Sequence, residues 1–365
     1  MAGWKKVKLE DVALLKAGKF ISAQMIAAKQ DPVNIYPCFG GNGTRGFVPN
    51  FSHEGFFPII GRQGALCGNV NLAQGKFYAT EHAVVASPKN GNNSIWLYYA
   101  LLFANLNQYA TGQAQPGISV ETINKVAFLL PPLEEQKKIA AMLSVWDSAI
   151  EKMEKLIDAK EDQKKSLIWK LIENTDAIRK EKIKIDDLFD EVCEKNHPDA
   201  DVLTIIQGTG TLLREKSGRD IVYDKKSLSN YKFVKKGDFI IHLRSFEGGL
   251  EVANQDGIVS PAYIILRPKI EVSTDYLYAL FHTNRFINYT ISPAVEGARD
   301  GRSVKYDALK KQFINLPTFS EQKYIAKIIT TAEKEHSLLK QQLENYKKQK
   351  QGLMQKLLTG QWRVK

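Results

Sequence analysis

The sequence has little cysteine, no long apolar run and no apolar leader at its start. Its cysteines, Cys38, Cys67 and Cys193, are odd in number and form no C-x-x-C pair, which argues against a disulfide framework and against a structural zinc site. No segment approaches the roughly 20 apolar residues that cross a bilayer, and the opening MAGWKKVKLEDV lacks a signal-peptide core. We therefore expect a cytoplasmic chain with no membrane partner.

Several catalytic motifs are also missing from the sequence. There is no G-x-x-x-x-G-K-[ST] phosphate loop, no H-E-x-x-H pair and no D…E-x-K nuclease pattern. The run Phe39 to Gly43 (FGGNG) is superficially similar to the F-x-G-x-G loop of S-adenosylmethionine-dependent methyltransferases, but no N-P-P-Y or D-P-P-Y segment accompanies it. These absences argue against a motor or ATPase, against a metal site and against a methyltransferase cofactor site in this chain.

What the sequence does contain is an ordinary globular composition with an excess of positive charge. It has 365 residues, 44% hydrophobic and 25% charged, enough for two or three domains. The net charge of +11 suggests a polyanionic partner, either nucleic acid or an anionic membrane. The excess is divided between residues 1–130 (11 basic, 6 acidic) and 317–365 (10 basic, 4 acidic), and the segments between are neutral. Nucleic-acid binding would thus depend on placed residues rather than on a basic tail.

A duplication runs through most of the chain. The segment PPLEEQKKIA from residue 131 matches PTFSEQKYIA from residue 317, so that Gln136 aligns with Gln322 at an offset of 186. Eleven of the 42 positions from 131 to 172 are identical to their counterparts without a gap. The interiors of the units that precede these segments match only loosely. Matching ends around divergent interiors suggest one scaffold that reads two different targets.

The two matching segments predict long amphipathic helices. Apolar residues recur at spacings of three and four in both, and a proline precedes each one. Because neither helix can bury its apolar stripe alone, we expect them to pack as an antiparallel coiled coil. The fold class is α+β, with two pseudo-symmetric mixed α/β domains. The expected boundaries are a first domain at 1–131, a first helix at 132–178, a second domain at 179–317 and a second helix at 318–365.

Both apolar stripes are interrupted at the same place, by Gln163-Lys164 and by Gln349-Lys350. The apolar contact that we expect between the two helices is called the seam. These polar residues either fix the register of the seam or form a solvated turn of helix, and the sequence leaves both open. Candidate residues for the seam or for docking a partner on the helices are Ile139, Trp146, Met153, Gln163, Ile325, Leu339, Tyr346 and Gln349.

Candidate DNA-contacting residues lie in the divergent units. A glycine-rich turn brings Asn42, Thr44 and Arg45 to a surface, and asparagine and arginine suit adenine and guanine edges in the major groove. Arg62 and Arg244 occupy matching places after short predicted strands. Polar residues of different kinds also occupy matching loops before the two helices. The full set is Asn42, Thr44, Arg45, Arg62, Gln63, Gln113, Gln115, Ser119, Arg214, Arg219, Arg244, Arg299, Arg302 and Ser303.

The doubled P-[PL]-x-x-E-Q-x-x-I-A segment around two divergent units resembles the specificity subunit of type I restriction–modification systems. The run GQAQPGIS from Gly112, shortly before the first copy, is the most specific signal, whereas the second copy departs from the pattern with RDGRS from Arg299. The resemblance covers essentially the whole chain. It implies two target-recognition domains, each of which reads one half of a bipartite site in double-stranded DNA, and helices that set the spacer between the halves.

The resemblance also implies the partners. Two adenine-N6 methyltransferase subunits would dock on the helices and restriction–translocase subunits would join them, with S-adenosylmethionine, ATP and Mg2+ bound by those partners. This chain would itself be no enzyme and would have no catalytic residues and no cofactor of its own. Other classes stay open: the specificity component of a two-subunit restriction enzyme that cuts both sides of its site, a coiled-coil adaptor that binds no DNA, and an enzyme with unrecognised motifs.

Overall fold

A computed structural model describes residues 3–112, 116–174, 180–218, 225–241, 249–297 and 303–364. The chain divides into two compact units. Unit 1 comprises residues 1–155 and 341–365, and unit 2 comprises residues 156–340. Each unit therefore contains one mixed domain together with part of each long helix.

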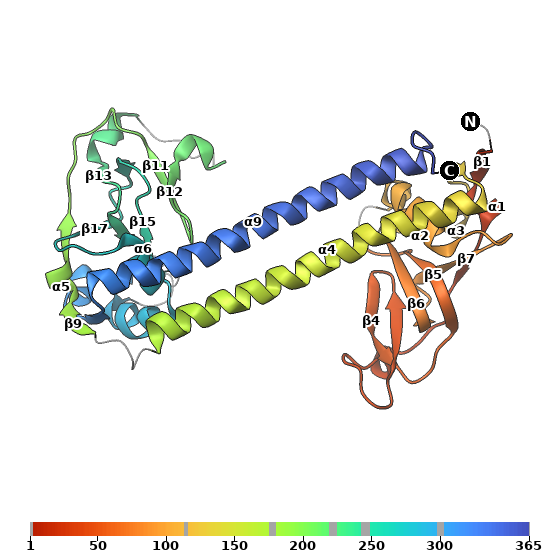
Figure 1. The fold of residues 1–365 in the computed structure, drawn as a ribbon, viewed down its shortest axis with the longest axis horizontal. Coiled ribbons are helices and arrows are strands. Elements are labelled where there is room, and N and C mark those ends of the chain that lie inside the picture. The colour runs from red at the N-terminus through yellow and green to blue at the C-terminus, as the bar shows by residue number, and fades with distance from the viewer. Residues whose placement is uncertain are drawn as a thin grey trace. The chain divides into compact units, whose positions relative to one another are not determined.

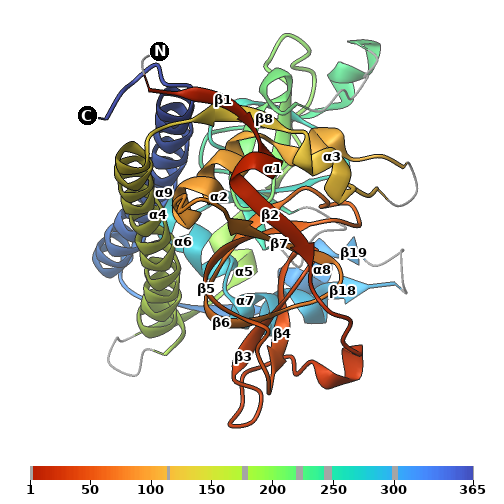
Figure 2. The same cartoon turned by 90° about the vertical axis from the view of Figure 1, so that its right-hand side faces the viewer.

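The domain of unit 1 is built on a six-stranded sheet with the strand order β2-β7-β5-β6-β3-β4. A separate antiparallel pair, β1 and β8, joins the start of the chain to the segment that leads into the first long helix, as Figure 2 shows. The strands are β1 (Lys5–Lys8), β2 (Ala13–Ala17), β3 (Tyr36–Gly40), β4 (Gly43–Val48), β5 (His53–Gly61), β6 (Val70–Ala79), β7 (Ala83–Pro88) and β8 (Ala127–Leu130).

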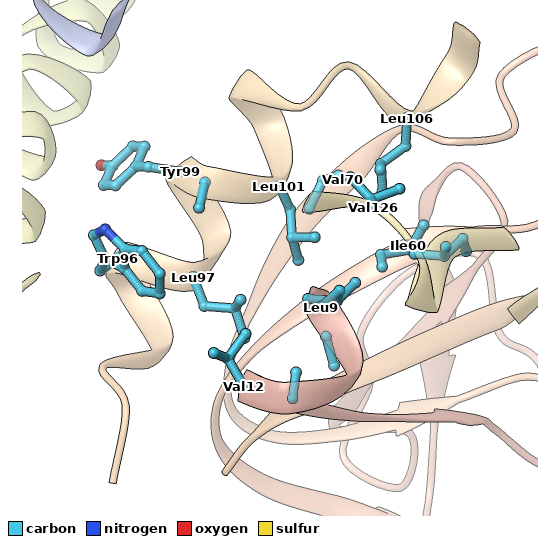
Figure 3. Close-up of a cluster of buried hydrophobic side chains, with 14 of the residues drawn as sticks. Leu9, Val12, Ile60, Val70, Trp96, Leu97, Tyr99, Leu101, Leu106 and Val126 are labelled. Carbon is cyan, nitrogen blue, oxygen red and sulfur yellow. The ribbon is translucent and has the colours of Figure 1, made fainter. Parts of the chain in front are cut away.

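The helix α2 (Ser94–Phe103) covers this sheet and carries much of its core. Its apolar residues are so dense that two of its faces are buried. Figure 3 shows Leu97 and Leu101 pointing toward Leu9 and Val12, whereas Tyr99, which belongs to the same cluster, points away from these residues. The shorter helices of unit 1 are α1 (Leu9–Val12), η1 (Ala23–Met25), η2 (Leu106–Tyr109) and α3 (Val120–Asn124).

The domain of unit 2 has a smaller, more divided set of sheets. Its largest has four strands in the order β10-β17-β14-β15, and four two-stranded pairs, β9–β20, β11–β12, β13–β16 and β18–β19, accompany it. The strands are β9 (Glu181–Lys184), β10 (Phe189–Val192), β11 (Leu203–Ile206), β12 (Gly210–Leu213), β13 (Lys232–Val234), β14 (Phe239–Ile241), β15 (Leu250–Val252), β16 (Gly257–Val259), β17 (Ile264–Pro268), β18 (Val295–Glu296), β19 (Ser303–Val304) and β20 (Phe313–Leu316).

The helices of unit 2 occupy positions like those of unit 1. The helix α6 (Thr274–Phe281) follows β17 as α2 follows β7, and its residues Tyr276 and Leu277 are fully buried. The other short helices are α5 (Ile185–Leu188), η4 (Arg214–Lys216), η5 (Lys225–Asn230), α7 (Asn284–Phe286), η7 (Ile287–Ile291), η8 (Ser292–Ala294) and α8 (Tyr306–Leu309).

The two long helices are α4 (Leu133–Ile168), which continues as the π-helical turn η3 (Trp169–Glu173), and α9 (Phe319–Leu358). Figure 1 shows both. Each begins two residues after its proline, Pro131 or Pro317, and α9 is followed closely by Gly360, whose φ of +71° favours glycine. Within each unit the helix segments run antiparallel, and the α+β class with two mixed domains and two long helices is confirmed.

Candidate nucleic-acid interface

Four loops of unit 1 converge at one end of its six-stranded sheet. The β3–β4 turn meets the end of β5, because a Cβ added to Gly61 would lie 1.8 Å from the carbonyl oxygen of Gly41. The β6–β7 turn joins them where Arg62 N–H donates to His82 O at 3.2 Å. The loop before α3 completes the group through the bridge between Gln63 and Gly117. Residues far apart in the sequence therefore form one polar surface, which we call the loop cluster.

The glycine-rich turn has the exposure that the sequence predicts. Asn42, Thr44 and Arg45 are all exposed. The side chain of Arg45 lies over Gly40, where a Cβ would come within 2.4 Å of its Cδ atom. The glycine thus lets an arginine lie flat along the hairpin and present its guanidinium to solvent.

Arg62 and Gln63 follow β5 in the same cluster. Arg62 is half-buried, and its buried Nε atom has no hydrogen-bond partner among the residues that the structure describes. Gln63 is exposed. Ser119 has a different position, since its hydroxyl caps α3 by accepting from Thr122 N–H at 3.0 Å. The remaining candidates of this domain, Gln113 and Gln115, lie outside the described residues.

Residues that the sequence analysis did not single out, Lys16, Lys19, His53 and His82, lie near this surface. Lys16 and Lys19 are exposed near the end of β2, and Lys19 N–H donates to Ala79 O at 2.9 Å. Burial and then these two lysines lower the pKa of His53 below its ordinary value. His82 is partly exposed and lies 3.1 Å from Glu81. Isolated lysines at a strand end carry no sequence signal, and only their position in space reveals them.

The two described candidates of unit 2 lie in different elements. Arg214 is half-buried at the start of η4, and its guanidinium carbon lies 6.0 Å from the centre of the Tyr231 ring. Ser303 pairs with Glu296 at the end of the β18–β19 pair that leads into the connecting loop. The candidates Arg219, Arg244, Arg299 and Arg302 lie outside the described residues.

The repeated glutamine of the E-Q-x-x-I-A segment joins each domain to its helix. Gln136 Nε2 donates to Pro131 O (2.9 Å) and Asn92 Oδ1 (3.0 Å), and its Oε1 accepts from Asn93 N–H (2.9 Å). Gln322 repeats this arrangement with Pro317 O and Ser273 N–H, each at 3.0 Å. Both glutamines are buried, 2% and 3% exposed. The repeated motif is therefore an architectural clamp between a helix start and the N-terminus of α2 or α6.

The isoleucines of the same motif are buried in the domain cores. Ile139 and Ile325 are 0% and 1% exposed and belong to the largest apolar clusters of units 1 and 2. The two isoleucines are predicted to serve either for docking a partner or in the contact between the helices, and the docking alternative is wrong for both, because the domains cover them. Leu357 and Leu358 of α9 join Ile139 in its cluster, so that both long helices contribute to the core of unit 1.

Further along the helices, a narrower seam holds α4 and α9 together in unit 1. Trp146 meets Tyr346 edge to face with the ring centres 5.9 Å apart, and Met153 is half-buried. In unit 2 Leu339 is also half-buried. These four residues have the burial expected of seam positions.

Of the two alternatives for the polar interruptions, Gln163 and Gln349 agree with the solvated turn of helix, and the lysines beside them have the buried positions. Gln163 and Gln349 are both exposed, whereas Lys164 and Lys350 are half-buried. Lys350 forms an ion pair with Asp147 across the helices, and Lys164 lies 3.1 Å from Glu161. An α-helix turns by 100° per residue, so that of two adjacent polar residues only one faces the seam.

The family model for "Type I restriction modification DNA specificity domain" matches residues 1–161 and 169–346, which include both domains and most of both helices. The chain belongs to this family.

Curated relatives of this specificity-domain family match parts of the chain. The type I restriction enzyme EcoprrI specificity subunit of Escherichia coli is 47% identical over 144 residues, which are 40% of this chain and 36% of that protein. The putative MjaX specificity subunit of Methanocaldococcus jannaschii is 25% identical over 330 residues, 82% of this chain and 76% of that protein. The match to the EcoprrI subunit therefore spans about a third of that relative's length.

Solved structures share the fold of this specificity-domain chain. An S subunit of a type I restriction–modification system from M. genitalium aligns with a TM-score of 0.65 at 16% identity, covering 97% of this chain and 96% of that one. A chain from a structure on complex assembly and conformational transition of the type I R-M system aligns at 0.58 and 14% identity, covering 99% of both.

The described part of this specificity-domain chain lacks membrane-spanning helices and metal-binding clusters. No helix there is long and apolar enough to cross a membrane. No group of three or more histidine, cysteine, aspartate or glutamate side chains there is placed to hold a metal ion.

Proposed function

We propose that this chain is the DNA-recognition subunit of a type I restriction–modification complex, and that each domain reads one half of a bipartite site. The family match over both units carries the proposal. The loop cluster of unit 1 supports it chemically, because exposed Arg45, Lys16 and Lys19 suit phosphates while exposed Asn42 and Gln63 suit base edges.

The long helices are the part of the chain that would set the distance between the half-sites. The 36 residues of α4 extend roughly 54 Å at 1.5 Å per residue. That length corresponds to about 16 base pairs at 3.4 Å each. Since the clamps at Gln136 and Gln322 attach each domain to the start of a helix, helix length would translate into spacer length.

The exposed apolar residues of the helices would dock two adenine-N6 methyltransferase subunits. Val145 is 68% exposed and Met142 lies one turn before it on the same face of α4. On α9, Tyr324 and Leu338 are 67% and 54% exposed. Because the duplication relates α4 to α9, each helix would offer one docking face, one in each unit.

The chemistry of the complex would belong to the partners. We propose that the chain itself is non-catalytic, that S-adenosylmethionine, ATP and Mg2+ bind to the methyltransferase and restriction–translocase subunits, and that the complex acts in the cytoplasm. Methylation of an adenine in duplex DNA requires the base to leave the helix, and the methyltransferase would hold it.

The test is methylation by the chain together with its adenine methyltransferase on DNA with defined half-sites. Asn42→Ala or Gln63→Ala should relax base preference in one half-site and leave the other unchanged. Lys155→Ala, on an exposed part of α4, should change neither and is the matched control. Loss of preference in both halves, or in neither, would contradict the assignment of this surface to DNA reading.

A further inference from the structure

A polar junction in unit 1 joins the recognition domain to both long helices at once. The Tyr99 hydroxyl, on α2 of the domain, donates to Asp147 Oδ2 of α4 at 2.5 Å. The other oxygen of Asp147 is paired with Lys350 Nζ of α9. Lys350 also lies over the Tyr99 ring, 5.4 Å from its centre. Three elements that are distant in the sequence therefore meet through three side chains.

The junction lies in surroundings that make its pairing selective. Lys350 is 17% exposed at its side chain, and Tyr99 is buried at 2%. Burial and the hydrogen bond to Asp147 raise the pKa of Tyr99, so that it remains a neutral donor. The neighbouring contact across the helices is the aromatic pair Trp146–Tyr346. If either helix moved by one turn, Asp147 would lose Lys350, or both Lys350 and Tyr99, and a partly buried carboxylate without these partners is unfavourable.

The duplication places a related junction in unit 2. The offset of 186 relates Asp147 to Glu333 and Lys164 to Lys350. Lys164 and His282, the residue that follows α6, both lie close enough to Glu333 to interact with it electrostatically. The helix that supplies the acid and the helix that supplies the lysine are exchanged between the units, as a two-fold related pair requires. The recurrence of an acid, a lysine and a side chain from the domain argues against an accidental surface ion pair.

We propose that Tyr99, Asp147 and Lys350 are positioning residues that fix the register of α4 against α9 and the seat of the first recognition domain on them. They contact no DNA, and their effect would be on how sharply the complex selects the spacer. A movement by one helical turn of 5.4 Å corresponds to roughly 1.6 base pairs. This inference rests on the proposed function for its readout on DNA but not for its readout on helix register.

The first experiment measures methylation rates of the complex on duplexes whose spacer is native, one base pair longer or one shorter. Lys350→Met, which keeps the volume and removes the charge, and Tyr99→Phe should each reduce discrimination against the altered spacers about tenfold, as expected for removing one member of a coupled network. Lys347→Met removes an exposed ion pair between the same helices, with Glu154, and is the matched control.

Each outcome of this experiment either supports or contradicts a stated proposal. Reduced discrimination in Lys350→Met, with near-normal methylation at the native spacer and partial restoration by exchanging the charges (Asp147→Lys with Lys350→Asp), supports the proposal. Unchanged discrimination overturns it. An equal loss of methylation at all spacers also overturns it, because the junction would then contribute stability alone. A wild-type complex that methylates no bipartite site would instead contradict the proposed function.

A second experiment reads the helix register in the full chain without DNA or partners. In a Cys193→Ser background, Glu154→Cys and Lys347→Cys are joined by a short bis-maleimide and report the native register, since the native side chains meet with Lys347 Nζ 2.9 Å from Glu154 Oε1. Glu154→Cys with Gln351→Cys reports a register displaced by four residues, about one turn. Adding Lys350→Met should lower the cross-linking yield of the first pair and raise that of the second. Yields that do not change would overturn the proposal whatever the chain's role on DNA.

Discussion

The buried glutamine clamp gives the sharpest prediction for the architecture. Gln136→Met replaces the side chain by one of similar length and removes three hydrogen bonds. Asn92 can turn toward solvent, but Asn93 N–H and Pro131 O would be left buried without a partner. An unsatisfied buried group costs about 1–3 kcal/mol, so that the expected loss in the free energy of unfolding is about 2–4 kcal/mol.

This loss should be visible as a lower melting temperature. Unit 1 comprises residues 1–155 and 341–365, and for a unit of that size 1 kcal/mol lowers the Tm by about 2–4 °C. Differential scanning calorimetry should therefore show the transition of unit 1 lowered by roughly 5–15 °C. The transition of unit 2 should not move, because its own clamp, Gln322, is intact.

Gln163→Met is the matched control, since Gln163 is an exposed glutamine on the same helix. Its effect should lie within about 0.5 kcal/mol of zero. If Gln136→Met were no more destabilising than Gln163→Met, the clamp would not be the reason for the repeated glutamine, and the reasoning would be refuted.

Three further predictions test other parts of the account. Burial is the largest effect on the pKa of His282 and opposes its protonation, but the hydrogen bonds to Glu251 and to the Tyr278 carbonyl and the charges of Glu251 and Glu333 together outweigh it and raise the pKa above 6.5. The resulting stabilisation of unit 2 should be complete below pH 6.5 and lost as the pH rises through the raised value. Denaturation of His282→Phe at several pH values should no longer show that loss. Gly61→Ala would place a Cβ 1.8 Å from Gly41 O, so DNA affinity in a binding titration should fall while the Tm of unit 2 stays constant; native affinity would contradict the close approach of the two loops. Val145→Asp should weaken association with the methyltransferase about tenfold or more in a sedimentation assay, as expected when an apolar interface residue becomes a buried charge, and unchanged association would remove this face from the docking surface.

Much of the architecture can be predicted from the sequence, because the duplication is visible in short segments of neighbouring residues. The recurrence at 186 residues predicts two related units, and the spacing of apolar residues predicts the two long helices. The exposed turn at Asn42 follows from its glycines, which are a local signal as well. These features depend on residues that are close together in the sequence.

The errors concern which face of a helix meets which neighbour. The stripe that contains Ile139 and Trp146 is continuous in sequence, yet Ile139 belongs to the domain core and Trp146 to the seam, since the domain covers only the start of the helix. The apolar periodicity of a long helix does not fix its rotation closely enough to show which of two adjacent polar residues faces the partner helix. The sequence therefore does not distinguish Gln163 from Lys164 as the residue that faces α9. The clamp contact between Gln136 and Asn93 joins residues 43 apart and has no local signature.

We propose that this chain directs methylation to a two-part DNA sequence. A genome-wide map of N6-methyladenine measures this directly. The chain is co-expressed with an adenine methyltransferase subunit, and the map is compared with one from cells that lack the chain. We expect methylation at one bipartite motif with a fixed spacer, and only in cells that contain the chain. A map without such a motif, although the two proteins form a stable complex, would contradict the claim and favour an adaptor that binds no DNA.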